Sequence, residues 1–204
     1  MGADVNLEAK LAGNMFGGPP AWIAAKLGHV EAMRVLLQAG ANAKWVSTDK
    51  KTLVWTAAEN GHAGVLDMLI KTGADVNRGT ISNMQKATPA YVAAQNGHIL
   101  ALKMLADQGA DVKEAAFLAA ESGDARTLKM LLKVGGDVNM AATDSGLTLA
   151  HIAALNGKDD VLEVLIDAGA DMNRPDKEGW TPASILKESS EDSRRAERLR
   201  SVLG

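Results

Sequence analysis

The sequence predicts an all-α solenoid in which short helix-turn-helix repeats stack side by side. Three observations lead to this prediction. A pentapeptide related to Gly-Ala-Asp-Val-Asn recurs through the chain, a second glycine precedes each later copy by a constant 12 residues, and leucines line one face of the segment between the two glycines. A repeat of this size cannot bury its apolar side alone, so neighbouring copies must stack.

The pentapeptide marks the end of each repeat, because its glycine suits the left-handed conformation in which many helices end. Its copies occupy residues 2–6, 40–44, 73–77, 109–113, 135–139 and 169–173. The preceding glycines are Gly28, Gly61, Gly97, Gly123 and Gly157. Since this distance is constant, all variation in repeat length must lie in the other half of the unit.

The segment between the two glycines is predicted to be a helix. Its fifth, eighth and ninth residues are apolar in every copy and share one helical face. The fifth residues are Met33, Leu66, Leu102, Leu128 and Leu162, the eighth are Leu36, Leu69, Leu105, Leu131 and Leu165, and the ninth are Leu37, Ile70, Ala106, Leu132 and Ile166. A shorter Ala-rich helix of about two turns is expected before each first glycine. Thr88-Pro89 and Thr181-Pro182 open two of these shorter helices as N-cap and N1 residues.

On these motifs, the chain resembles the ankyrin-repeat family over essentially all of its 204 residues. The family pattern is Thr-Pro-Leu-His, then Ala-Ala, Gly-His and the closing pentapeptide, and residues 87–113, ATPAYVAAQNGHILALKMLADQGADVK, come close to it. The resemblance implies short β-hairpin fingers between stacked ankyrin repeats. It also implies a single domain over residues 1–204, with a partial repeat at 1–6, repeats at about 19–44, 52–77, 88–113, 114–139 and 148–173, and a C-terminal capping repeat at 174–204.

The chain departs from the family at the histidine of the Thr-His pair. Only His151 occupies that position, and the other repeats carry Trp22, Trp55, Tyr91, Phe117 and Ser184. In the family the pair supports a hydrogen-bond network at the base of the loop. We predict that the aromatic residues replace this network with apolar packing between repeats, with a ligand-binding aromatic box as the alternative. We expect His151 to bond to a backbone group of a loop.

No pattern in the sequence points to an enzyme, and we predict no catalytic residue, metal or cofactor. The chain has no cysteine, so disulfides and thiolate ligands are excluded. His29, His62 and His98 recur at one repeat position, and packed helices lie about 8–10 Å apart, too far for neighbours to share a zinc ion readily. Four aspartates recur beside the closing turn, where we expect them to accept bonds from backbone NH groups. They are Asp75, Asp111, Asp137 and Asp171.

Composition and charge narrow the class of partner. The formal net charge is −3, from 22 Lys and Arg against 25 Asp and Glu, which gives no electrostatic basis for nucleic acid as the main partner. No stretch approaches the roughly 20 apolar residues needed to insert into a membrane. Since the start also lacks the pattern of a signal peptide, we expect a soluble, cytoplasmic and monomeric protein.

The resemblance implies that a protein or peptide partner binds the concave face, which consists of the fingers and the exposed side of each first helix. The residues carried over by position are Phe16, Lys26, Leu27, Trp45, Val46, Glu59, Asn60, Ile81, Met84, Gln95, Asn96, Glu121, Leu147, Leu155 and Asn156. Several finger residues are large and apolar, which favours a binding surface. The alternative is that neighbouring fingers cover them.

Three functions stay open. The first is a protein-binding scaffold. The second is a regulatory or targeting ankyrin module cut from a larger multidomain enzyme, channel or effector protein. The third is a small-molecule receptor, which needs an enclosed pocket that an open concave face seldom provides. Because the chain opens on the tail of a repeat, either residues 7–19 cover that end or the chain was cut from a longer array, and we expect the cut.

The fourth repeat has no room for a finger. Only Glu114, Ala115 and Ala116 separate Lys113 from Phe117, and a chain spans at most about 3.3–3.6 Å per residue. Either the long third finger leans over this gap, or the gap is a notch that accepts a side chain or strand of the partner. The notch would be lined by Ile81, Met84, Glu114, Glu121 and Leu147.

Overall fold

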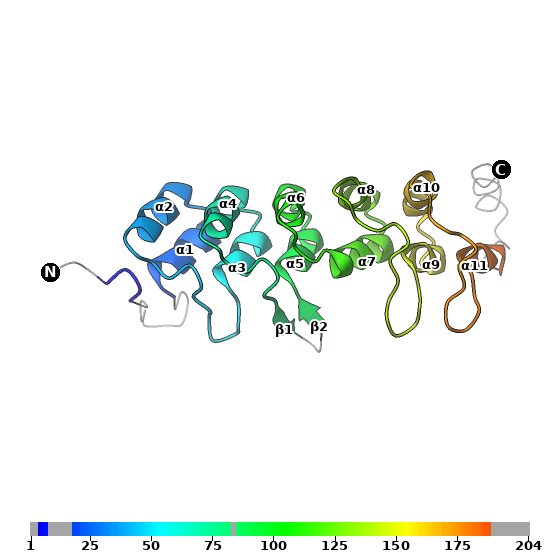
Figure 1. The fold of residues 1–204 in the computed structure, drawn as a ribbon, viewed down its shortest axis with the longest axis horizontal. Helices are drawn as coiled ribbons and strands as arrows, with labels where there is room; N and C mark the ends of the chain where they lie inside the picture. Colours follow the sequence, from blue (N-terminus) through cyan, green and yellow to red (C-terminus); the bar gives the residue numbers. More distant parts are fainter. Residues whose placement is uncertain (1–3, 8–17, 83–84, 189–204) are drawn as a thin grey trace. The chain divides into compact units, whose positions relative to one another are not determined.

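The computed structural model describes residues 4–7, 18–82 and 85–188 (Figure 1). These residues form pairs of antiparallel helices and a single two-stranded hairpin. The chain divides into two units, Met1–Asp111 and Val112–Gly204.

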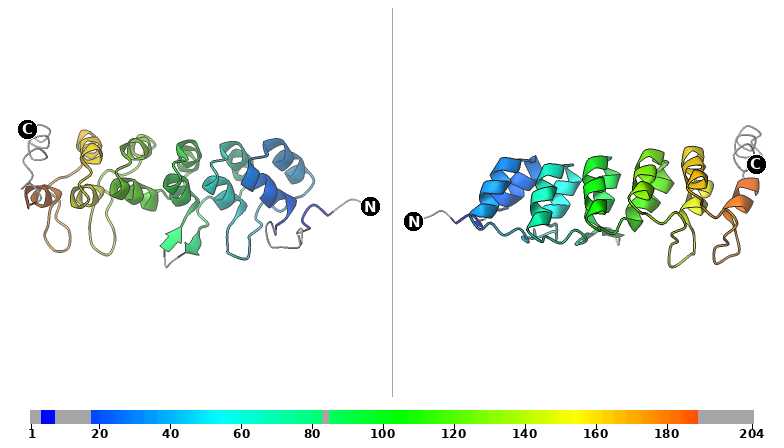
Figure 2. Two further views of the ribbon diagram at one scale, coloured as in Figure 1. Left: turned by 180° about the vertical axis from the view of Figure 1, so that it is seen from behind. Right: turned by 45° about the horizontal axis from the view of Figure 1, so that its top comes forward.

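The first unit stacks three helix pairs. Its first helices pack against one another in the order α1, α3, α5, and its second helices in the order α2, α4, α6, so they form two layers (Figures 1 and 2). The helices are α1 (Pro20–Leu27), α2 (Val30–Gln38), α3 (Leu53–Glu59), α4 (Ala63–Lys71), α5 (Pro89–Gln95) and α6 (Ile99–Asp107). The strands β1 (Thr80–Ser82) and β2 (Gln85–Ala87) form the antiparallel hairpin, in which Thr80 pairs with Ala87.

The second unit repeats this arrangement. Helices α7, α9 and α11 form one layer, and α8 packs against α10 in the other. The helices are α7 (Lys113–Ser122), α8 (Ala125–Lys133), α9 (Leu149–Leu155), α10 (Asp159–Asp167) and α11 (Pro182–Glu188). The later part of the predicted capping repeat, residues 189–204, lies outside the described residues. The prediction of an all-α fold built from short helix pairs is confirmed.

Threonine caps and glycines set the ends of the first helices. The Oγ1 atoms of four threonines accept hydrogen bonds from the backbone NH groups three residues later, namely Thr52, Thr88, Thr148 and Thr181. The predicted N-cap roles of Thr88 and Thr181 are therefore confirmed, and Thr52 and Thr148 cap their helices in the same way. At the end of α1, Gly28 has a φ of 73°, and a Cβ added there would lie 2.5 Å from His62 Nδ1. Only glycine fits this turn without strain or displacement of the neighbouring repeat.

The predicted leucine columns form the core. All five residues at the fifth position of the second helices are fully buried, from Met33 in α2 to Leu162 in α10. The eighth position is buried in four repeats, whereas Leu36 is only half-buried, because no described helix pair precedes α1 and α2. The ninth position is half-buried throughout, so it forms the margin of the core rather than its centre.

Asparagine and aspartate side chains connect the closing turns. Asp75 Oδ1 accepts a hydrogen bond from Asn77 N at 2.8 Å, and Asp137 and Asp171 do the same within their own turns, as predicted. Asn77 Oδ1 in turn accepts from Asp111 N in the next repeat at 2.7 Å. Asn139 Oδ1 bonds to Asp171 N at 2.8 Å in the second unit. The pentapeptides at 73–77 and 135–139 therefore shape their own turns and also fix the turns that follow.

The recurring histidines also act between repeats. His62 Nε2 lies 3.0 Å from the carbonyl of Lys26, and His98 Nε2 lies 3.1 Å from the carbonyl of Glu59. Both carbonyls belong to the end of the first helix in the preceding repeat. Each imidazole therefore supplies a donor to the end of a helix, where the last carbonyls have no partner within the helix itself.

The loops of the first helices differ in length, and one is missing. A bridge between Val46 and Thr52 closes the loop before α3, and one between Ala141 and Thr148 closes the loop before α9. Helix α7 begins at Lys113, immediately after the closing turn. The prediction that the fourth repeat has no finger is confirmed.

Candidate functional site

The predicted partner-binding residues are described to different extents. Phe16 and Met84 lie outside the described residues, and Ile81 is described only as part of β1. Trp45, Val46 and Leu147 lie in fingers and are half-buried. Neighbouring groups therefore cover part of each of these apolar side chains and leave the rest in solvent.

The predicted apolar residues at the ends of the first helices are more exposed than the predicted apolar residues of the fingers. Leu27 is 52% exposed and Leu155 is 57% exposed, which makes them the prominent apolar groups at these positions. The other predicted residues at helix ends are polar, and they are half-buried at Lys26, Glu59 and Asn60 and exposed at Gln95, Asn96, Glu121 and Asn156. The Nδ2 atoms of Asn60, Asn96 and Asn156 each donate to the carbonyl four residues earlier, so these side chains help to close their helices.

The residues at the histidine position of the Thr-His pair do more than pack against the next repeat. Trp55 is buried, and its Nε1 donates a 3.1 Å hydrogen bond to the carbonyl of Ala87. His151 occupies the equivalent position of α9, and its Nε2 lies 3.0 Å from the carbonyl of Trp180. Both carbonyls come directly before the N-terminal threonine of the next first helix. The prediction of purely apolar packing is therefore wrong for Trp55, because the edge of the indole carries an NH group that reaches the carbonyl at the position equivalent to the one that His151 contacts.

His151 also confirms the expected bond to a loop. Its Nδ1 accepts a 3.0 Å hydrogen bond from Thr148 N, which completes a capping box with Thr148 Oγ1. The two ring nitrogens thus hold the start of α9 and the loop before α11 together.

A charged pair covers Trp55 in the first unit. Lys51 Nζ lies 4.0 Å from the centroid of the Trp55 ring and 3.3 Å from Glu59 Oε1. Lys26 Nζ lies 5.0 Å from the Trp22 ring in the same layer. Both contacts are within the range of a cation–π interaction. The solvent side of this layer is therefore polar near both tryptophans.

The second unit has a hollow in the corresponding place. Its volume is about 670 Å³, and it lies between the loop before α9 and the loop before α11, beside the end of α9 and Ile185 of α11. Leu147, Leu155, Trp180 and Ile185 supply apolar side chains, and Trp180 is 41% exposed. The polar groups that line it are Asp144, Ser145, Asp176, Lys177 and Glu178.

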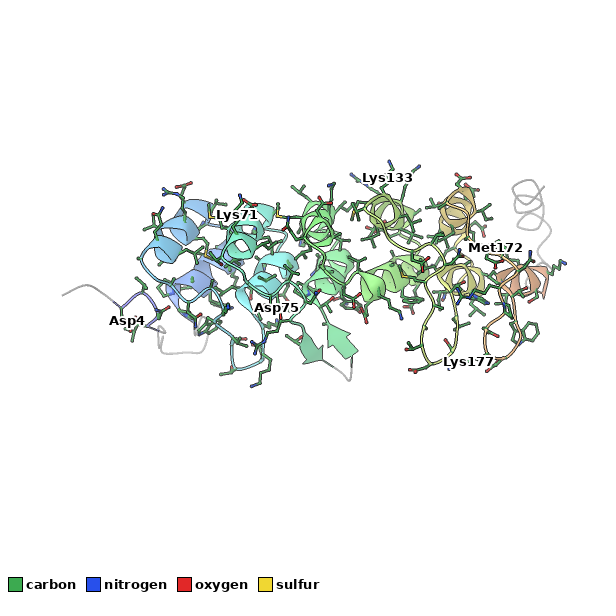
Figure 3. All side chains as sticks on the ribbon, in the orientation of Figure 1. Asp4, Lys71, Asp75, Lys133, Met172 and Lys177 are labelled. Atoms are coloured by element: carbon green, nitrogen blue, oxygen red, sulfur yellow. The ribbon has the colours of Figure 1, made fainter. Side chains whose placement is uncertain are left out.

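Backbone and side-chain hydrogen bonds hold the two loops around the hollow. Lys177, labelled in Figure 3, donates from its backbone N to the carbonyl of Ser145 and from Nζ to the carbonyl of Thr143, each at 3.0 Å. Asp176 Oδ1 accepts bonds from the backbone NH groups of Glu178 and Trp180, each at 2.9 Å. The walls of the hollow are therefore fixed by the fold before any partner binds.

Sequence reasoning found two of the apolar residues of this hollow and missed two. Leu147 and Leu155 were predicted as partner-binding residues, whereas Trp180 and Ile185 were assigned only to the capping repeat. A signal for Trp180 was present, because it precedes Thr181 just as Leu147 precedes Thr148. Ile185 has no comparable signal.

The structure does not bring together the residues of any other site considered in the sequence analysis. Among the described residues, no group of three or more histidine, aspartate or glutamate side chains is placed to hold a metal ion. The residues of the predicted notch are divided between the units, with Ile81 in the first and Glu114, Glu121 and Leu147 in the second, so the notch stays a prediction. Within the described part of the chain, no helix is long and apolar enough to cross a membrane.

Comparisons with known proteins identify the architecture. A family model of ankyrin repeats in three copies matches residues 1–80, 21–116 and 116–186. A crystal structure of an ankyrin repeat domain from Acinetobacter baumannii is 25% identical, covers 90% of this chain and 97% of its own, and superposes with a TM-score of 0.74. Curated protein sequences give no match.

Two further solved structures share the fold at lower identity. The human ASB11 ankyrin repeat domain is 19% identical with a TM-score of 0.60, and the match covers 91% of this chain and 98% of that one. One chain of the complex between the predatory endopeptidase Bd0816 from Bdellovibrio bacteriovorus and the immunity protein Bd3460 is 21% identical, with a TM-score of 0.68. The match covers 89% of this chain and 97% of that one.

Proposed function

We propose a function from one established premise, namely that the chain belongs to the ankyrin-repeat family, whose members generally serve as protein–protein interaction modules. The chain is a non-catalytic scaffold that binds a protein or peptide partner through the face made by its fingers and first helices. The observation that carries this proposal is the hollow in the second unit, where Leu155 and Trp180 stay exposed beside half-buried Leu147. Apolar groups gathered in a concave place favour a contact with another protein.

The non-catalytic part of the proposal rests on how the polar groups are used. Asp75, Asp137 and Asp171 are held by the backbone of their own turns, and His62, His98 and His151 by carbonyls of neighbouring repeats. A general acid or base must instead reach a substrate proton at hydrogen-bond distance. These groups therefore support a structural role.

Photo-crosslinking tests the face. We place the crosslinking residue p-benzoylphenylalanine at position 27 or 155 on the first helices, and at position 35 or 100 on the second helices. Val35 is 54% exposed and Leu100 is 68% exposed, so they match Leu27 and Leu155 in exposure and apolar character. In the cell that produces the protein, we expect a crosslinked partner from positions 27 and 155 and none from 35 and 100.

Crosslinks from the second helices alone would contradict the proposal, because the partner would then bind the opposite layer. The second reading, in which the chain is a regulatory or targeting module of a larger enzyme, channel or effector, gives the same face a different partner. Mass spectrometry of the crosslinked product separates the two readings. A crosslink to another part of the same polypeptide would support the regulatory module.

A further inference from the structure

We infer that the hollow between the loops before α9 and α11 binds an extended segment of a partner protein in which a large apolar residue stands next to arginine or lysine. This inference rests on the proposed function and specifies the chemistry of the partner. It uses the second unit alone. Three properties of the hollow support it, namely its apolar base, its acidic rim and its fixed walls.

The apolar base is large enough to take a large side chain. Leu147 and Leu155 from the two ends of α9, and Trp180 and Ile185 from the start of α11, line one hollow of about 670 Å³. Pockets that bind ligands typically measure about 300–1,000 Å³ and are lined mainly by apolar and aromatic groups. A leucine, methionine or aromatic side chain that enters here removes exposed surface of Leu155 and Trp180 from water, which stabilises the complex.

The rim is acidic. Asp144, Asp176 and Glu178 line the hollow, against one cationic group, Lys177. The Lys177 ammonium donates to the carbonyl of Thr143, so a backbone oxygen of the neighbouring loop already holds it in place. Three carboxylates against one positioned ammonium favour a cationic residue of the partner beside the inserted apolar one.

Arginine suits this arrangement in two ways. Its guanidinium forms paired hydrogen bonds with a carboxylate, and it also stacks on an aromatic ring. Trp180 is exposed beside the carboxylates, so one partner residue can contact both. The first unit contains the intramolecular version of this contact, where Lys51 lies over Trp55 and also pairs with Glu59.

The fixed walls reduce the cost of binding. The loop that carries Trp180 is held by Asp176 Oδ1, by the His151 ring and by the contact of Lys177 with Ser145. Groups that are already ordered lose little conformational freedom when a partner binds. A short segment can therefore bind without a large interface.

The test selects random peptides displayed on phage with the full chain and sequences the enriched clones. We expect enriched peptides to contain a large apolar residue with arginine or lysine within a few positions. Synthetic versions are then measured by fluorescence anisotropy against the full chain and against variants. We expect Trp180→Ala to weaken binding by about tenfold or more, as removal of a central aromatic contact does. We expect the double variant Asp144→Asn, Glu178→Gln to weaken binding and to reduce its salt dependence.

Matched controls keep the result interpretable. Leu100→Ala removes an exposed apolar group from α6, and Glu31→Gln removes an exposed carboxylate from α2, and neither is expected to change peptide binding. Circular dichroism and thermal unfolding verify that each variant is folded. If Trp180→Ala does not fold, the double variant Asp144→Asn, Glu178→Gln alone tests the inference. It should fold, because both residues are exposed.

Three results would overturn the inference. These are enrichment of acidic peptides, enrichment of no peptide, and binding that is unchanged by the variants of Trp180, Asp144 and Glu178. The proposed function is tested separately by crosslinking. Suppose that the partner crosslinks at position 27 but that the variants at Trp180, Asp144 and Glu178 bind the peptides as tightly as the native chain. The scaffold proposal then stands and this inference fails. If the partner crosslinks only at positions 35 and 100, the proposed function itself fails.

Discussion

The second and fifth repeats use the same three positions in different ways. Thr52 caps α3 and Thr148 caps α9, so the positions around them correspond. The residue before the threonine is Lys51 in one repeat and Leu147 in the other. The last residue of the helix is Glu59 in one and Leu155 in the other. An ion pair at 3.3 Å in the second repeat is thus replaced by two apolar side chains in the fifth.

The buried position between them behaves differently from the surface pair. Trp55 and His151 differ in size and chemistry, yet each supplies a ring nitrogen to the carbonyl that precedes the next helix. Each of these partly buried carbonyls would lose a hydrogen bond between repeats if the ring carried no nitrogen, so the bond persists while the ring changes. No such constraint acts on the surface pair. Its chemistry is therefore free to differ, which in the fifth repeat leaves a hollow with an apolar base.

The largest expected effect comes from the core, which both units share. Leu105→Ala in α6 and Leu165→Ala in α10 each remove a fully buried side chain at the same repeat position. We expect each to lower the free energy of unfolding by about 2–5 kcal/mol, measured by urea denaturation. Leu100→Ala, at an exposed position of α6, is the control and should cost far less. A similar cost for Leu100 and Leu105 would contradict the assigned faces of α6.

The next largest effect is expected from replacing the buried rings of Trp55 and His151. His151→Phe removes the bonds to Thr148 N and to the Trp180 carbonyl. Loss of a partner for a buried polar group costs about 1–3 kcal/mol, so His151→Phe should lower the free energy of unfolding by at least this amount. Trp55→Phe removes the bond to the Ala87 carbonyl and also leaves a cavity, because phenylalanine is smaller than the buried indole. Trp55→His leaves a cavity as well but keeps a ring nitrogen, so it should be more stable than Trp55→Phe. Urea denaturation measures all three variants. Unchanged stability in His151→Phe would show that the capping box at Thr148 adds nothing, and equal stability of the two Trp55 variants would show the same for the bond to Ala87.

A transplant tests whether the surface pair decides binding. The double variant Leu147→Lys, Leu155→Glu gives the fifth repeat the charged pair of the second. Since exposed and half-buried surface positions usually change stability by no more than about 0.5 kcal/mol, we expect the fold to persist. Binding of the selected peptides should fall by about tenfold, which corresponds to about 1.4 kcal/mol. The reverse variant, Lys51→Leu, Glu59→Leu, is the matched control and should leave binding at the hollow unchanged. Undiminished binding by the transplant would show that Leu147 and Leu155 are not contacts.

Much of the fold follows from periodic positions in the sequence. The glycine spacing and the leucine columns predict the helix pairs, because both depend on local geometry that recurs in every copy. The missing finger of the fourth repeat follows from chain length alone, because only three residues separate Lys113 from Phe117. The observed start of α7 at Lys113 agrees with this prediction. The hydrogen bond from Trp55 is harder to predict, because it depends on the direction in which one ring edge points.

The candidate site is only partly predictable for the same reason. Leu147 and Leu155 are visible in the sequence as apolar residues at positions that are normally polar. Whether Trp180 and Ile185 join them depends on how the loop before α11 folds back, and that is decided by bonds such as Lys177 N to the Ser145 carbonyl. These are contacts between separate loops, and no local pattern encodes them.

The smallest expected effect is the contribution of the ion pair between Lys51 and Glu59 to the free energy of unfolding. Lys51 and Glu59 are both half-buried, and pairs of this kind contribute about 0.2–1 kcal/mol and weaken as salt rises. A double-mutant cycle with Lys51→Met and Glu59→Gln, measured by urea denaturation at low and high salt, isolates the coupling between them. Lys51→Met should cost more than Glu59→Gln, because the ammonium also lies 3.8 Å from Asp49 Oδ2 and 4.0 Å from the Trp55 ring centroid. If the two single variants cost the same, neither of these further contacts contributes. A coupling that does not fall with salt would mean that the pair is shielded from solvent, and the second and fifth repeats would then differ in their packing as well as in their surface chemistry.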